Sequence, residues 1–153
     1  HDVYDLSRKF VDRGTLDRDR FNEHLRLAIF KEIALSRINT VVTHAFSATY
    51  VSKTGLGDSA YMKKIQSIVE KAGGNIYFVH LITDKKELLK RVAGASRKKF
   101  LKLVDPKVMT GILENKTKDL KTSAPVRNNL VIDNTNLSPK KVVDVVIKHF
   151  KLK

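Results

Sequence analysis

The sequence predicts an α/β fold with a mainly parallel sheet that is covered by helices on both faces. Three short apolar runs, at residues 40–46, 76–82 and 129–133, have the composition of buried strands. Segments with apolar residues at helical spacing separate these runs. Strands that alternate with helices of this length favour right-handed βαβ crossovers, which make neighbouring strands parallel.

The clearest strand-to-helix unit lies between Gly73 and Lys102. The apolar run from Ile76 to Ile82 follows two glycines and ends shortly before Asp84. Asp84 is expected to be the N-cap of a helix, with Glu87 three residues later completing a capping box. Gly94 then interrupts the helical pattern and a cationic stretch follows, so we expect a hinged, Arg/Lys-rich lid segment at about 91–104.

The remaining elements follow from helical periodicity and from residues typical of helix ends. Asp133 ends the third apolar run and is expected to cap the turn that follows it. Glycines at 73 and 74 indicate a left-handed helix end. We expect helices at residues 3–11, after Thr15 or Asp17, after Asp58 or Ser59, after Asp105-Pro106, and after Ser138-Pro139.

The composition indicates one globular domain over residues 1–153. The chain has no cysteine, which excludes a disulfide scaffold and thiolate metal sites. Its five histidines have no metal-ligand spacing, so no metal site is expected. We find no apolar run long enough to span a bilayer and no signal peptide, and we therefore expect a cytoplasmic protein without a membrane partner.

The formal net charge of +14 is unevenly distributed along the chain. Residues 1–83 hold 12 basic against 9 acidic residues, a net charge of +3, whereas residues 84–153 hold 18 against 7, a net charge of +11. A basic region of this kind can serve nucleic acid, acidic lipid or a phosphorylated small molecule. Lysine-rich surfaces also occur in heat-adapted proteins, so charge alone does not select a partner.

Three segments together resemble the small P-loop kinase superfamily, in particular its shikimate-kinase-like and AAA-type ATPase-like members. Residues 72–103 resemble the strand, helix and arginine lid of that group. Residues 128–150 resemble its last strand, adenine-side loop and closing helix, and residues 24–46 resemble the helix and strand before the lid. The resemblance implies a three-layer αβα fold, binding of ATP with Mg²⁺, and phosphate transfer to a small-molecule acceptor that the sequence does not identify.

Two features depart from the family pattern. The phosphate loop, G-x-x-x-x-G-K-[S/T], does not occur in this sequence, and the glycines at 55, 57, 73 and 74 lack its Gly-Lys-Ser/Thr end. Because the chain begins with His1 and not with Met, we expect upstream residues that supply this loop and the first strand. Thr43 and His44 occupy the region in which many P-loop enzymes carry an Asp that helps to hold magnesium.

The resemblance assigns roles to individual side chains. It places Arg97 at the transferred phosphate as a catalytic residue and Arg91 near the nucleotide base or phosphates, where a planar guanidinium can pair two oxygens. The loop beside the adenine would run from Asn134 to Pro139, with Asn134, Asn136, Ser138 and Pro139 as its nucleotide-binding residues. His44, expected at the carboxyl end of a strand, and Arg127, just before the last strand, are further candidates for ligand binding.

Other interpretations of the same residues remain open. The arginines can be solvated surface charges, and the Asn and Ser residues can be turn and cap residues. The chain can also be a kinase-fold remnant that binds nucleotide without catalysis, or a basic nucleic-acid-binding module. The nucleic-acid-binding interpretation is disfavoured, because residues 84–153 lack interleaved aromatic residues for base stacking and carry no recognition motif.

Overall fold

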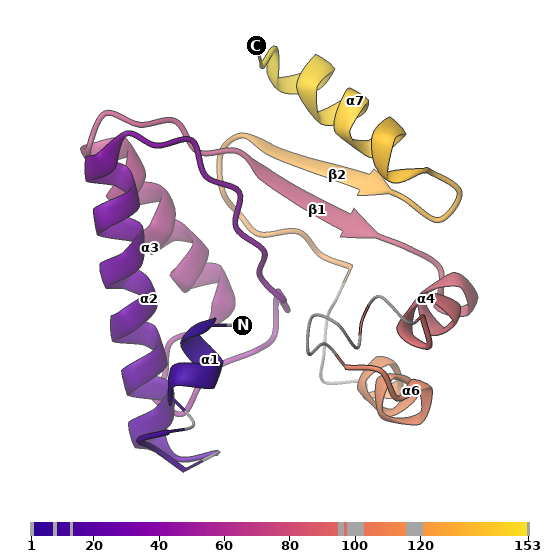
Figure 1. Ribbon diagram of the computed structural model, residues 1–153, viewed down its shortest axis with the longest axis horizontal. Coiled ribbons are helices and arrows are strands. Elements are labelled where there is room, and N and C mark those ends of the chain that lie inside the picture. The colour runs from indigo at the N-terminus through magenta and orange to yellow at the C-terminus, as the bar shows by residue number, and fades with distance from the viewer. Residues whose placement is uncertain are drawn as a thin grey trace. The chain divides into compact units, whose positions relative to one another are not determined.

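The computed structural model describes residues 2–7, 9–12, 14–94, 97, 103–115 and 121–152 (Figure 1). The chain divides into two compact units. Unit 1 comprises His1–Ile76 with Ala124–Val126, and unit 2 comprises Tyr77–Ser123 with Arg127–Lys153. The described elements include helices and strands, so the protein is a mixed α/β protein. The expectation of a single domain stays a prediction.

Unit 1 is helical, with α1 (Asp2–Ser7), α2 (Leu16–Ser36) and α3 (Asp58–Lys71). Thr15 caps α2, as predicted, because its Oγ1 accepts a hydrogen bond from Arg18 N at 3.2 Å. Helix α2 packs against both α1 and α3. Met62 and Ile65 of α3 are buried, which confirms the apolar face predicted for this helix.

The strand predicted at residues 40–46 is wrong. These residues, all of which the structure describes, have irregular backbone and form no strand. Val41 is 96% exposed and Val42 is half-exposed, so the segment is not buried either. The β-branched residues that suggested a strand favour an extended backbone, but a strand also requires a neighbour to which its amides can bond.

Residues 51–57 form a short loop that hydrogen bonds attach to α2. Val51 and Gly57 form an antiparallel bridge that closes the loop, and Gly55 adopts a left-handed conformation within it. The Glu23 carboxylate on α2 accepts hydrogen bonds from Ser52 Oγ at 2.6 Å and from Thr54 Oγ1 at 2.7 Å. Acidic side chains of α2 therefore fix the connection that leads into α3.

Unit 2 is built on two parallel strands, β1 (Phe78–Ile82) and β2 (Asn129–Asp133) (Figure 1). Phe78 lies opposite Asn129 and Ile82 lies opposite Asp133. Beyond the strands, Asn134 N donates to Ile82 O at 2.8 Å. The apolar runs predicted at 76–82 and 129–133 are thus confirmed as strands, of which the first begins at Phe78, and their carboxyl ends lie side by side. Their predicted burial on both faces is wrong, because Val79, Leu81 and Val131 are exposed.

Among the described residues, unit 2 contains the helices α4 (Lys85–Val92), α6 (Pro106–Glu114) and α7 (Pro139–Phe150). Helix α4 packs against α6, and α7 packs against β2. Val92 is fully buried and Ile132 is 5% exposed, so these two side chains mark the core of the unit. The side chains of the predicted N-caps accept helix amide hydrogen bonds, as expected, at Asp84, Asp105 and Ser138.

Two predicted caps differ in detail. Helix α3 has Gly57 as its N-cap, so the prediction of Asp58 or Ser59 is wrong, and the Asp58 carboxylate instead accepts a hydrogen bond from Ser47 N at 2.9 Å. The capping box at α4 is only half formed. Asp84 Oδ1 accepts from Glu87 N at 2.7 Å, whereas Asp84 N donates to Thr135. A partner from the neighbouring loop thus replaces the glutamate that the sequence pattern proposes.

In the part of the chain that the structure describes, no helix combines the length and the apolar character required to cross a bilayer. Of the predicted lid segment at about 91–104, residues 91–94, 97, 103 and 104 are described. The other lid residues lie outside the described residues.

Candidate functional site

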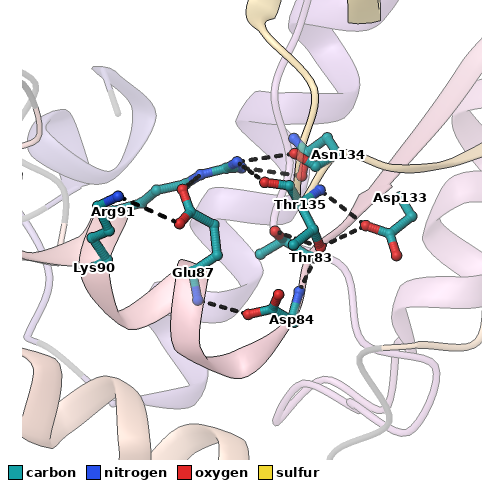
Figure 2. A network of polar contacts seen from close by, with 8 residues as sticks. All are labelled: Thr83, Asp84, Glu87, Lys90, Arg91, Asp133, Asn134 and Thr135. Atoms are coloured by element: carbon teal, nitrogen blue, oxygen red, sulfur yellow. Dashed lines mark hydrogen bonds and ion pairs between the residues drawn. The ribbon is translucent and has the colours of Figure 1, made fainter.

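Arg91 connects the last turn of α4 to the turn that follows β2. Its Nη1 donates to Asn134 Oδ1 at 3.1 Å, and its Nη2 donates to the backbone oxygens of Asn134 at 2.9 Å and Thr135 at 3.0 Å (Figure 2). The structure therefore brings together two residues that the sequence predicted separately as nucleotide-binding, Arg91 and Asn134. Both lie at the carboxyl edge of the parallel strands.

The remaining nitrogen of the Arg91 guanidinium is also engaged. Arg91 Nε donates to Glu87 Oε1 at 2.8 Å, one helical turn earlier on α4. The Arg91 side chain is 34% exposed, so solvent reaches part of the group although all three nitrogens donate hydrogen bonds. In general, an arginine whose nitrogens are hydrogen-bonded can still stack on a ring through the planar face of its guanidinium.

Thr135 is the centre of the polar network in Figure 2. Its Oγ1 donates to Asp133 Oδ1 at 2.6 Å, and it accepts hydrogen bonds from Asp84 N at 2.9 Å and from Thr83 Oγ1 at 3.2 Å. Asp84 and Thr83 belong to the loop between β1 and α4, whereas Thr135 belongs to the turn between β2 and α7. One hydroxyl therefore joins the two connections at this edge of the sheet.

The same contacts change the acidity of Asp133. Hydrogen bonds from the Thr135 hydroxyl, and then from the Thr135 backbone N–H, lower the pKa of the Asp133 carboxyl below its ordinary value of 3.8. The backbone bond, from Thr135 N to Asp133 Oδ1, is 2.9 Å long and closes a turn. This confirms the prediction that Asp133 caps the turn after its strand.

The rest of the predicted adenine-side loop continues from this turn. Leu137 N donates to Asn134 O at 3.2 Å, and Asn136 is exposed in the turn. Ser138 Oγ accepts from Lys141 N at 3.3 Å as the N-cap of α7, and Pro139 is the first residue of that helix. Ser138 thus has the cap role that the alternative interpretation gave it, and Pro139 begins the helix. A role of these two residues in nucleotide binding stays a prediction.

Arg97 makes a different kind of contact. Its Nε donates to the backbone oxygen of Leu103 at 2.8 Å, and its own N–H donates to Gly94 O at 3.1 Å. Among the residues that the structure describes, no acidic side chain forms an ion pair with Arg97. A bond to a neutral carbonyl orients the side chain but does not itself neutralise the positive charge.

The two remaining candidates are not among the residues whose contacts form the Arg91 network. Arg127 is exposed and precedes the amino end of β2, whereas Arg91 reaches the turn at the carboxyl end of that strand. His44 belongs to unit 1, and its expected place at the end of a strand is wrong because no strand forms there. Its Nε2 lies 3.6 Å from Asp58 Oδ1, and its ring packs against Tyr61 at 5.5 Å between centroids.

Sequence reasoning included Thr135 in the adenine-side loop but gave it no role, and it missed the ion pair of Glu87 with Arg91. The Glu87–Arg91 pair has the spacing of helix ion pairs, so the sequence did carry that signal. For Thr135 the only local signal is its position two residues after Asp133, which is typical of an Asx-type turn. Nothing in the sequence indicates its bond to Asp84.

The chain is thus an α/β protein with a polar network across the carboxyl ends of two parallel strands. No group of three or more His, Asp or Glu side chains suited to a metal ion occurs among the described residues. Comparison of the chain with family models, with curated proteins and with solved structures yields no match. Assignment of the network to a particular chemistry therefore rests on its geometry and on the resemblance described above.

Proposed function

We propose that the protein is an ATP-binding, P-loop-kinase-like phosphotransferase of the cytoplasm with a three-layer αβα fold. The observation that carries this proposal is the Arg91 contact with Asn134 and Thr135. It lies at the carboxyl edge of parallel strands, which is the edge at which α/β sheets bind their ligands. The same two segments are those that resemble the lid helix and the adenine-side loop of the kinase superfamily.

In this proposal Arg91 serves the nucleotide base and not its phosphates. Four of the five N–H groups of its guanidinium already donate to protein oxygens, so a two-point pairing with phosphate would require breaking at least one of those bonds. Its planar face is compatible with stacking on a base, an interaction to which arginine is well suited. Asn134, Asn136, Ser138 and Pro139 would border the same base, because they form the turn that Arg91 holds.

Arg97 is the proposed phosphate-binding residue of the lid. Its one hydrogen bond to Leu103 O uses Nε and leaves its charge without an acidic partner in the described part of the chain. During phosphoryl transfer, negative charge spreads over the transferred group, and a positioned guanidinium stabilises that charge. Arg97 would therefore affect turnover more than ground-state affinity.

The proposal requires a phosphate loop, because backbone amides and a lysine must hold the phosphates. Residues 1–153 do not contain that motif, so it has to come from another part of the protein. The described residues also offer no three-residue metal cluster, and Asp133 Oδ1 is already bonded to Thr135. The described residues therefore do not fit a magnesium site; an ion held elsewhere in the protein would neutralise phosphate charge.

The test is ATP binding and turnover by the full-length protein. We expect ATP to bind, Arg91→Ala to weaken binding about tenfold, and Lys90→Ala to leave it unchanged. Lys90 is the matched control because it neighbours Arg91 on α4, is 82% exposed, and lies 3.9 Å from the Glu87 carboxylate. Arg97→Ala should lower turnover about a hundredfold with little change in affinity. Absence of ATP binding at millimolar concentration would refute the proposal.

The outcome also separates the two rival functions. ATP binding without turnover by the full-length protein would favour a non-catalytic nucleotide-binding protein. Tight binding of DNA or RNA that weakens steeply with salt would favour a nucleic-acid-binding module. Ion pairs already compensate part of the basic half, since Lys85 pairs with Glu114 at 2.7 Å and Lys140 with Asp144 at 3.3 Å.

A further inference from the structure

We propose that Thr135 is a positioning residue, whose hydroxyl locks the β1–α4 loop to the β2–α7 turn and so sets the position of Arg91. The inference rests on the proposed function for its ligand, and it adds a residue that the resemblance does not assign. Thr135 itself would contact neither phosphate nor base through its hydroxyl. It would act through the elements that it joins.

The hydroxyl of Thr135 is fully used. A hydroxyl can donate one hydrogen bond and accept two. Thr135 Oγ1 donates to Asp133 at 2.6 Å and accepts from Asp84 N at 2.9 Å and from Thr83 at 3.2 Å. No donor or acceptor capacity of this group is left for a ligand, so the role that remains is to hold the protein.

The contacts attach α4 to the turn at both ends of the helix. At its start, the N-cap residue Asp84 donates its N–H to the Thr135 side chain. In its last turn, Arg91 donates to the Thr135 and Asn134 backbone oxygens. A shift of the turn would therefore move the Arg91 guanidinium, and small misplacements of a binding group reduce binding and catalysis strongly.

The experiment compares Thr135→Val, which keeps the side-chain shape but removes the hydroxyl, with Thr135→Ser, which keeps the hydroxyl. Thr110→Val on α6 is the matched control, because the contact of the Thr110 hydroxyl among the described residues is within its own helix, to Pro106 O at 2.9 Å. The measurements are affinities of the full-length protein for ATP and for inorganic tripolyphosphate, and amide hydrogen exchange at Asp84. Tripolyphosphate has no base, so it reports on the phosphate side alone.

We expect Thr135→Val to weaken ATP binding about tenfold and to leave tripolyphosphate affinity within about twofold. Exchange at the Asp84 amide should become faster in this variant. Thr135→Ser should stay within about twofold of the wild type for both ligands, and Thr110→Val should match the wild type throughout. If Thr135→Val does not fold, Thr83→Val removes the longest of the three contacts and should give the same changes at smaller size.

Two results would overturn the inference. One is a folded Thr135→Val protein with wild-type ATP affinity. The other is an equal loss of ATP and tripolyphosphate binding, which would indicate general destabilisation. If the wild type binds tripolyphosphate but not ATP, the proposed base site fails and the ligand role of Thr135 fails with it. The exchange rate at Asp84 would then still decide whether Thr135 couples the two loops.

Discussion

Arg91 and Asn134 lie 43 positions apart in the chain and are joined by two hydrogen bonds, one to the Asn134 side-chain oxygen and one to its backbone oxygen. Hydrogen bonds from a charged donor are shorter and stronger than those between neutral groups. The pair therefore fixes the last turn of α4 to the turn after β2. Its contribution to folding can be measured independently of any ligand.

Arg91→Ala should lower the free energy of unfolding by about 2 kcal/mol. The substitution removes the Arg91 hydrogen bonds to the Glu87 carboxylate, the Asn134 side-chain oxygen and the Thr135 backbone oxygen. Arg91→Lys should recover only part of this loss, since an ammonium cannot reproduce the planar fork. Urea unfolding monitored by circular dichroism provides the measurement. Lys90→Ala is the control and should change the value by less than about 0.5 kcal/mol. Equal effects at 90 and 91 would contradict the assigned contacts.

The acidity of Asp133 should depend on Thr135. In the wild type the Thr135 hydrogen bonds hold the pKa of Asp133 below 3.8, so the ionised form is favoured in the folded state. The resulting stabilisation is present above the ordinary pKa and is lost as the pH falls through the lowered value. Thr135→Val should raise the pKa of Asp133 toward 3.8, as read from the carboxyl carbon shift in an NMR titration. A titration identical to that of the wild type would show that the hydroxyl contact is absent.

Residues 40–46 should tolerate polar substitution. Val41 is 96% exposed, so Val41→Asp is expected to change the free energy of unfolding by less than about 0.5 kcal/mol. Ile65 of α3 is 3% exposed, and Ile65→Ala should cost about 2–5 kcal/mol through lost burial and a residual cavity. Chemical unfolding of both variants checks the contrast. A cost above about 2 kcal/mol at Val41 would mean that this segment is buried in solution, as a central strand would be.

The Glu23 contacts should stabilise the loop before α3. Glu23→Ala removes the acceptor of the Ser52 and Thr54 hydroxyls, and we expect a loss of about 1–2 kcal/mol. Glu32→Ala is the matched control, because Glu32 is exposed on the same helix. Thermal unfolding of the two variants provides the comparison. Similar melting temperatures for both variants would show that the loop does not depend on Glu23.

The sequence predicted those elements whose signals are local. The run from Phe78 to Ile82 is apolar on both faces, and the capping residues Asp84 and Ser138 each bond an amide three positions away, so short windows contain the relevant information. The same reasoning failed at residues 40–46. There the composition favours a strand, but whether a partner strand is present is not a local property.

The candidate site was predictable in its residues but not in its contacts. Arg91 and Asn134 were each singled out by the resemblance to the kinase superfamily, the first in its lid helix and the second in its adenine-side loop. The contact between them depends on the parallel pairing of β1 with β2, which cannot be predicted from a short window of sequence. Thr135 was overlooked because a threonine in a turn is common, and its importance comes from Asp84, which lies 51 positions earlier.

The pairing of Phe78 with Asn129 has a consequence for how the chain reaches its native state. A parallel pair cannot form by a tight turn; a long loop must close first, and the entropy cost of closure precedes any reward from the ladder. The hydrogen bonds of helices α4 and α6 join residues that are close in the chain, so these helices require no long loop to close. The rate of refolding of unit 2 should accordingly be limited by the pairing of β1 with β2. The Arg91 contacts should form only at that late step.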